Sequence, residues 1–262
     1  MKRLFLVFSF LATAFAGATQ TDSLNLDPVY NQAFLPGEKL TYLLHYGFFD
    51  AGNAVLEVKP SSKTFEGRNT WHVVGTGKSI GAFDWFFKVR DRYESYIDAE
   101  AIIPYEFIRD VNEGGYKINQ HYRLDQFNQK VYTDKKDTIL VKPNIQDMLS
   151  SFYYARTLNF DTAQSGDIYT IPAIVDGEYF ALQIKYVGRE AISLRNGKYQ
   201  CIKFRPVLQK GRIFEEEEDL NVWITDDKNR IPVMAQAKIL VGSIKMELTG
   251  YSGLAHPIAR LR

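Results

Sequence analysis

A glycine-rich run at residues 74–79 comes nearest to a known chemical motif. Val74-Gly75-Thr76-Gly77-Lys78-Ser79 contains the Gly-Lys-Ser that closes a phosphate-binding loop. That loop needs another glycine five positions before Gly77, and His72 occupies the position. The run also leads to Phe83 and Trp85 rather than to a clear helix. We therefore interpret it as a glycine-rich turn or bulge, not as a nucleotide site.

Histidine and cysteine, the usual metal ligands and nucleophiles, are few and scattered. The single cysteine, Cys201, excludes an internal disulfide and a cysteine cluster for zinc or iron–sulfur. Its neighbours Ile202 and Phe204 favour a buried thiol. The histidines lie on separate segments without metal-ligand spacing: His45, His72, His121 and His256. Neither HExxH nor SxxK occurs, so we predict no catalytic residue, no metal and no cofactor.

Acidic side chains leave a weaker catalytic hypothesis open. Asp91, Glu94 and Asp98 could pair in space as the two carboxylates of a carbohydrate-active enzyme. The run of residues 215–219 is acidic throughout but lacks the spaced oxygen ligands and central glycine of a calcium loop. We interpret it as a solvated turn on a hairpin.

The most aromatic segment is Gly81-Ala82-Phe83-Asp84-Trp85-Phe86-Phe87. Five of its seven residues are apolar, which favours a place in the core. The alternative is that Trp85, Phe86 and Phe87 line a ligand cavity or contact a partner protein.

One segment has the periodicity of a helix, residues 144–158. Ile145, Met148, Leu149 and Phe152 are spaced to share one helix face. Asn144 is the expected N-cap, with Asp147 three residues later in the capping-box position. Near the far end, Tyr154 and Arg156 could bind an anionic headgroup, although a packing tyrosine and a solvated arginine are the favoured interpretation.

Elsewhere the chain reads as short alternating strands divided by glycine turns, with Gly114-Gly115 a good hairpin turn. Of its 262 residues, 45% are hydrophobic, enough to bury a sizeable core. The net charge of +1 argues against a nucleic-acid protein. Strand and helix do not alternate, which disfavours Rossmann and TIM folds.

The N-terminus has the pattern of a secretory signal. Lys2 and Arg3 precede an apolar run from Leu4 to Phe15, and Ala14-Phe15-Ala16 offers a cleavage site. We predict a signal peptide over residues 1–16 and a periplasmic or secreted mature chain without a membrane span. Residues 17–36 are expected to form a leader that is loose or laid across the surface.

Residues 37–255 are expected to form one β-rich domain. Shifting the chain by about 128 residues aligns Tyr96-Ile97-Asp98 with Trp223-Ile224-Thr225, among other matches. The halves, about 38–125 and 166–251, are either duplicated units or merely similar meanders. Both interpretations give a mainly β fold: two antiparallel meanders forming a strongly bent sheet or open barrel, with one short helix between them that covers its mouth or one edge.

Several blocks together resemble the bacterial exported proteins grouped as domain of unknown function 3108. They include Pro36-Gly37-Glu38-Lys39-Leu40-Thr41-Tyr42, Asp91-Arg92-Tyr93-Glu94-Ser95, Tyr153-Tyr154-Ala155-Arg156 and Trp223-Ile224-Thr225-Asp226-Asp227. The resemblance covers residues 34–252 and implies a β-rich envelope protein without an established activity. The closing turns are loosely similar to those of Lol-type periplasmic lipoprotein carriers, which implies a bent sheet around an apolar cavity.

The leading hypothesis is a noncatalytic envelope protein that binds a lipid-like ligand on the concave face of the sheet. An envelope adaptor with an aromatic surface for another protein is the second hypothesis, and the carbohydrate-active enzyme is the third.

Overall fold

The computed structural model describes residues 26–207, 220–238 and 242–261. Strands account for most of them, and two short helices interrupt the strands. The first half contains β1 (Lys39–Tyr46), β2 (Phe49–Phe65), β3 (Arg68–Ser79), α1 (Gly81–Phe86), β4 (Val89–Asp98), β5 (Pro104–Glu113), β6 (Tyr116–Asp125), β7 (Lys130–Tyr132) and β8 (Thr138–Leu140). After α2 (Met148–Ala155), the second half contains β9 (Ile168–Val175), β10 (Glu178–Leu194), β11 (Gly197–Pro206), β12 (Leu220–Thr225), β13 (Pro232–Lys238), β14 (Ser243–Ser252) and β15 (Arg260–Leu261).

All strands belong to one antiparallel sheet, in the order β8-β7-β6-β5-β4-β3-β2-β1-β14-β13-β12-β11-β10-β9, with β15 paired to β11. Each half is a meander, and the first strand of one pairs with β14 of the other. The strand-rich meanders and the bent sheet predicted from alternation are confirmed. Duplication of the halves stays a prediction.

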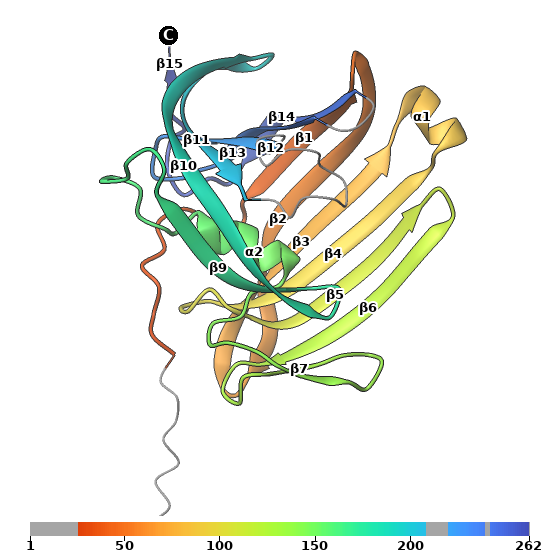
Figure 1. Ribbon diagram of the computed structural model, residues 1–262, viewed down its shortest axis with the longest axis vertical. Helices are drawn as coiled ribbons and strands as arrows, with labels where there is room; N and C mark the ends of the chain where they lie inside the picture. The colour runs from red at the N-terminus through yellow and green to blue at the C-terminus, as the bar shows by residue number, and fades with distance from the viewer. Residues whose placement is uncertain (1–25, 208–219, 239–241, 262) are drawn as a thin grey trace, which may run out of the picture.

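The sheet bends so strongly that β9 and β10 pass in front of the first half (Figure 1). Both 17-residue strands carry a register shift, between Pro60 and Thr64 in β2 and between Tyr186 and Gly188 in β10. Such bulges bend a strand and increase its twist. The shifts therefore let the two ends of the sheet approach each other.

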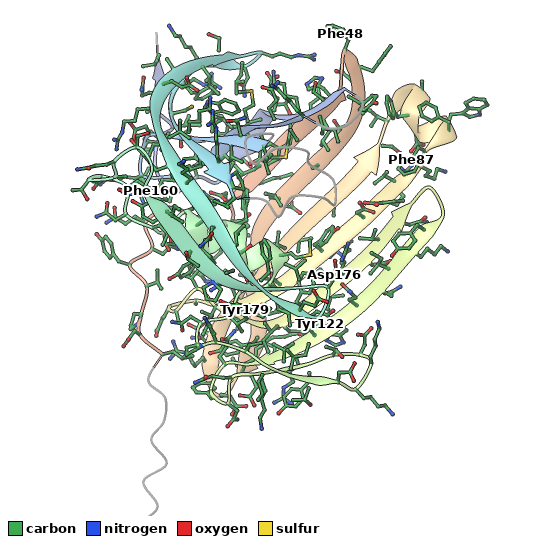
Figure 2. All side chains as sticks on the ribbon, in the orientation of Figure 1. Phe48, Phe87, Tyr122, Phe160, Asp176 and Tyr179 are labelled. Carbon is green, nitrogen blue, oxygen red and sulfur yellow. The ribbon has the colours of Figure 1, made fainter. Side chains whose placement is uncertain are left out.

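The β9–β10 hairpin contacts the opposite half at its tip. Asp176 in the turn forms an ion pair with Arg109 on β5, with 2.7 Å between Asp176 Oδ1 and Arg109 Nη1. Figure 2 places Asp176 and Tyr179 beside Tyr122 of β6. Lys142, which follows β8, lies 5.2 Å from the ring of Tyr179. These contacts tie the second half to the first at the far end from the β1–β14 pair.

Helix α2 lies inside the bend rather than over its mouth or along an edge. Leu149 and Tyr153 pack into a core cluster with Val58, Val73 and Ile97 of β2, β3 and β4. The opposite side of α2 faces β10, β11 and β12. The helix therefore fills space between the two halves.

The N-cap of α2 is Asp147, and the expectation of Asn144 is wrong. Asp147 Oδ1 accepts hydrogen bonds from the backbone N–H groups of Leu149 and Ser150, at 2.8 and 2.7 Å. The Ser150 hydroxyl accepts a hydrogen bond from the Asp147 N–H, which completes a capping box. Asn144 has a φ of 59° and belongs to the preceding turn.

Two local predictions in the first half are wrong. The glycine-rich run lies within β3, in regular register with β2 and β4, so it is neither a turn nor a bulge. Gly75 lies where a Cβ would be tightly placed, 3.2 Å from the Leu56 side chain and 3.5 Å from Leu149 of α2. The segment after it forms the helix α1, which the sequence did not reveal.

The described part of the leader, residues 26–36, is mostly exposed or half-buried, as expected for a segment laid across the surface, but it is anchored in the core near its end. Ala33 and Phe34 are fully buried. Phe34 makes an edge-to-face contact with Tyr153 of α2, with ring centroids 4.8 Å apart. The leader therefore closes one end of the space that α2 occupies.

The predicted signal peptide and the acidic run at 215–219 lie outside the described residues. Neither helix in the described ranges has the length and apolar character that a transmembrane segment requires.

Candidate functional site

Arg156, which the sequence suggested as a solvated or anion-binding side chain, is buried in an ion pair. Only 2% of the residue is exposed. Its Nη1 and Nη2 contact the two carboxylate oxygens of Glu38 at 2.6 and 2.7 Å. Nε and Nη2 also donate to the carbonyl of Asn229, and Nη2 to that of Ala33. Because every guanidinium nitrogen is occupied within the protein, the solvated interpretation is wrong.

The other polar residues of α2 are structural in their contacts. Tyr154 is half-buried against the core cluster of α2, as the packing interpretation predicted. Asp147 is fully buried and accepts a 2.6 Å hydrogen bond from the Ser95 hydroxyl of β4. Burial raises the pKa of Asp147 to about 6, against the opposing effect of these hydrogen bonds.

An apolar cavity of about 240 Å³ lies on the concave face, between α2 and strands β10, β11 and β12. The helix contributes Met148 and Phe152, and Phe160 follows it in the chain. The strands contribute Leu182, Ile184, Phe204, Pro206, Val222 and Ile224. Such walls suit a hydrocarbon group, because they offer dispersion contacts and few competing hydrogen bonds.

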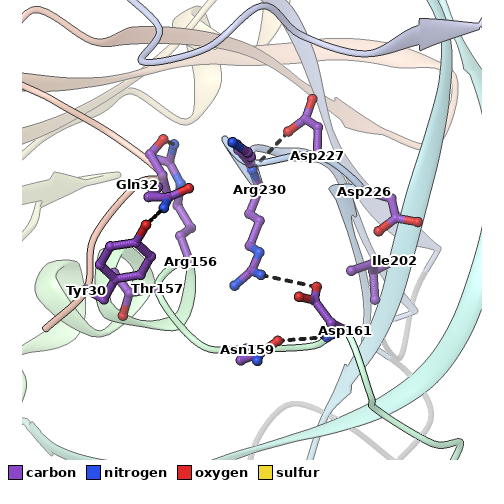
Figure 3. A pocket seen from close by; sticks show the side chains of 12 residues that line it. Tyr30, Gln32, Arg156, Thr157, Asn159, Asp161, Ile202, Asp226, Asp227 and Arg230 are labelled. Atoms are coloured by element: carbon purple, nitrogen blue, oxygen red, sulfur yellow. Dashed lines mark hydrogen bonds and ion pairs between the residues drawn. The ribbon is translucent and has the colours of Figure 1, made fainter.

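A second, polar cavity of about 500 Å³ adjoins the first, and Arg156 contributes to the walls of both. Figure 3 shows Arg230 extending toward Asp161, with Asp226 and Asp227 to its right. Arg230 lies 3.8 Å from Asp161, a long ion-pair contact, and its guanidinium carbon is 5.2 Å from the ring centroid of Phe160. Burial lowers the pKa of Arg230.

Phe160 connects the two cavities. Its ring belongs to the wall of the apolar cavity, packed against Phe204 at 4.7 Å between centroids, and one face lies under Arg230. A cation therefore lies on one side of Phe160 and the apolar cavity on the other, an arrangement that suits an amphipathic anion. None of the cavity-lining residues except Arg156 was proposed from the sequence, because they come from segments far apart in the chain.

Trp85, Phe86 and Phe87 lie at the opposite end of the first half and not at these cavities. Trp85 is 90% exposed, Phe86 63% and Phe87 47%. The core interpretation of this segment is therefore wrong. Phe83 alone of its aromatic residues turns inward, toward Tyr46 of β1 at 5.9 Å between centroids.

The candidate carboxylates of an enzyme have separate partners. Glu94 contacts His72 and Arg92, and Asp98 contacts Arg68 and Tyr105. Asp91 accepts a hydrogen bond from the backbone of Asn112. Within the described residues, no three His, Cys, Asp or Glu side chains are grouped to share a metal ion.

Ser79 is a candidate nucleophile that the sequence predictions above omit. It is central to Gly77-Lys78-Ser79-Ile80-Gly81, which has the G-x-S-x-G spacing of a nucleophile elbow between a strand and a helix. Its hydroxyl donates to Asp84 at 2.7 Å and accepts from the backbone N–H of Val89 at 2.8 Å. Its hydrogen bonds thus join β3 to α1 and β4 rather than to a histidine base.

Cys201 is fully buried in β11, as its neighbours predicted. Burial raises the pKa of its thiol to about 12, which keeps it protonated and unreactive near neutral pH. The histidines also have hydrogen-bonded roles. His45 contacts Asp50 at 2.9 Å, and His72 contacts Glu94 at 2.6 Å.

The family model of proteins of unknown function DUF3108 matches residues 41–249. This confirms the resemblance predicted from the sequence blocks. No curated protein matches the chain.

Solved structures with similar folds include a β-barrel-like protein of domain of unknown function DUF1849 from Brucella abortus. That chain is 10% identical, with a TM-score of 0.56 and coverage of 85% of this chain and 99% of its own. A hypothetical protein from Chlamydia trachomatis is also 10% identical, with a TM-score of 0.38, covering 88% of this chain and 94% of that one. The first likeness supports the bent-sheet fold and nothing about a ligand.

Proposed function

The chain belongs to the DUF3108 family of proteins of unknown function, and from this premise we propose that it is a noncatalytic, exported protein that binds a lipid-like ligand. The observation that carries the proposal is the apolar cavity on the concave face, walled by α2 and β10–β12. The signal-like N-terminus supports a periplasmic or secreted location, where such a ligand would come from the cell envelope.

The hydrocarbon part of the ligand occupies the apolar cavity. At about 240 Å³ the cavity is slightly smaller than the roughly 300 to 1,000 Å³ of complete small-molecule sites. It therefore holds one chain of an amphipathic molecule, while the polar part extends into the adjoining cavity.

Arg230 is the residue that favours an anionic polar end. Arg156 is the weaker candidate, because each of its guanidinium nitrogens is bonded to Glu38 or a backbone carbonyl and only 2% of the residue is exposed. Among the described residues, the Arg230 guanidinium lies over the Phe160 ring and makes a long 3.8 Å ion-pair contact to Asp161, whose side chain is 80% exposed. A carboxylate or phosphate that replaced Asp161 would form a charge-assisted contact in the polar cavity, next to the apolar one.

Binding of a fluorescent fatty acid, with lauric acid as competitor, tests the proposal. Ile184→Trp places a larger side chain in the cavity, and we expect the affinity to fall at least ~10-fold, about 1.4 kcal/mol. Leu140→Trp is the matched control, since Leu140 is 75% exposed on β8, away from the cavity. Equal binding by both variants, or no binding by the wild type, would refute the proposal.

The role of Arg230 is tested with two competitors of equal chain length. Arg230→Gln should weaken competition by lauric acid and leave competition by the uncharged dodecanol unchanged, because only the acid uses the cation. If competition by both molecules weakened equally, Arg230 would not be the residue that binds the anionic end. The proposal that the apolar cavity binds the hydrocarbon part would still stand.

A further inference from the structure

Five exposed aromatic side chains gather at one end of the first half, and we call them the aromatic rim. Phe48 and Phe49 belong to the β1–β2 hairpin, where Phe48 is fully exposed and Phe49 69% exposed. Trp85, Phe86 and Phe87 belong to α1 and the residue after it. Figure 2 shows Phe48 at the hairpin tip and Phe87 at the neighbouring end of β4.

The aromatic rim is held by packed contacts beneath it. Ile80 donates a 3.0 Å backbone hydrogen bond to Ala51 of β2, and Phe83 packs between Tyr46 and Phe86, at 5.9 and 5.0 Å between centroids. The Phe87 ring lies so close to Gly114 that a Cβ there would come within 2.5 Å of it. Adjacent hairpins thus present these aromatic groups together at an edge where each is exposed to water.

Basic residues flank the part of the aromatic rim that α1 carries. In the segments 46–50, 78–90 and 113–117, Asp84 is paired with Arg90, and Asp50 contacts His45 and Arg195. The exposed charges that remain there are three lysines, Lys78, Lys88 and Lys117, against one acid, Glu113. The rim is therefore positive as well as apolar, although the whole chain carries a net charge of only +1.

We propose that the aromatic rim docks the protein on an anionic lipid surface. Tryptophan and phenylalanine partition to the boundary of headgroups and acyl chains, and neighbouring lysines contact anionic headgroups. The rim consists of separate turns that project at a sheet edge, a shape that enters a fluid interface more readily than it fills a protein groove. This surface is distinct from the apolar cavity and goes beyond the proposed ligand binding.

Cosedimentation with vesicles tests the proposal. The probes are vesicles of phosphatidylcholine alone and of phosphatidylcholine mixed with phosphatidylglycerol. We expect the wild type to bind the mixed vesicles more tightly, and added salt to weaken the binding. The double variant Trp85→Ser, Phe86→Ser should bind at least ~10-fold more weakly, because the apolar area that enters the interface is lost.

Three further variants separate the causes. Lys88→Glu should reduce binding to the mixed vesicles and abolish their advantage over phosphatidylcholine. Leu140→Ser removes an equally exposed apolar side chain elsewhere and should bind as the wild type does. Ile184→Trp should also bind vesicles as the wild type does. A failure of the proposed ligand binding in the cavity can then be distinguished from a failure of the proposed membrane binding by the rim.

Two outcomes would overturn the proposal. One is a wild type that sediments with neither kind of vesicle. This outcome also counts against the proposal if the wild type instead captures another envelope protein in a Trp85-dependent way. The other is equal vesicle binding by the Trp85→Ser, Phe86→Ser and Leu140→Ser variants. Because the rim residues make few buried contacts, circular dichroism and thermal unfolding should show that these variants fold normally.

Discussion

At the scale of single residues, the Glu38–Arg156 pair holds together parts of the chain that are far apart in sequence. The pair joins the leader, the start of β1, the end of α2 and the turn at Asn229. Both side chains are essentially inaccessible to water. A buried ion pair adds little compared with an apolar replacement, but removing one partner leaves an uncompensated charge.

We expect Glu38→Gln to lower the free energy of unfolding by about 3 to 5 kcal/mol, because the buried guanidinium loses its counter-charge. Urea denaturation measures the loss. Glu57→Gln is the matched control, since Glu57 forms a partly exposed pair with Lys39 at 3.2 Å and should cost less than about 1 kcal/mol. Similar losses in the two variants would contradict the structural role of the buried pair.

Asp147 predicts a pH dependence of stability. Its pKa of about 6 in the folded protein exceeds the value near 4 of an unfolded chain, so the folded state holds the proton more tightly. The stabilisation that results is fully present below about pH 4 and is lost as the pH rises through about 6.

Comparison with Asp147→Asn isolates this effect, because the amide oxygen retains the capping acceptor but does not titrate. The wild type should lose about 3 kcal/mol relative to the variant between about pH 4 and pH 7. Urea denaturation in buffers across this range measures the difference. A difference that stays constant with pH would show that Asp147 does not change its ionisation on folding.

At the scale of elements, the sequence predicts what depends on local pattern. Alternation marked most strands, Gly114-Gly115 marked a hairpin turn, and helical spacing marked α2. The position of α2 was not predictable in this way. Leu149 and Tyr153 pack on β2–β4 while Met148 and Phe152 face β10–β12, so the helix contacts apolar groups on two sides.

The wrong predictions concern residues whose environment is set by contacts between distant segments and not by the local sequence pattern. The residues 81–87 are as apolar as a core segment, but they project beyond the ends of β3 and β4, where the sheet provides nothing to cover them. Gly75 suggests a turn from its residue type, yet it lies mid-strand beneath α2, where the side chains of Leu56 and Leu149 pack close to it. The cavity residues are distant in sequence, and only the bend of the sheet brings them together.

At the scale of the whole molecule, contacts at several places around the bend join the two halves. β1 pairs with β14, α2 packs between the halves, and Arg109 holds Asp176 at the β9–β10 turn. These connections lie at different places around the bend. Neither half covers α2 by itself, so separating them would expose apolar surface on both. We therefore propose that the halves form a single cooperative unit, whether or not they arose by duplication.

Cooperativity of this kind is measurable with one tryptophan in each half. Trp71 lies on β3 and Trp223 on β12, and the third tryptophan, Trp85, lies on α1. Variants in which Trp85 and one of the other two are replaced by phenylalanine therefore report on each half separately by fluorescence. In urea, we expect both probes to give the same midpoint and the same dependence on denaturant, because unfolding of one half removes the core contacts of the other. If the Trp223 signal changed at a lower urea concentration than the Trp71 signal, the second half would unfold while the first stayed intact. In that case the β1–β14 pair and α2 would join two independent domains instead of one.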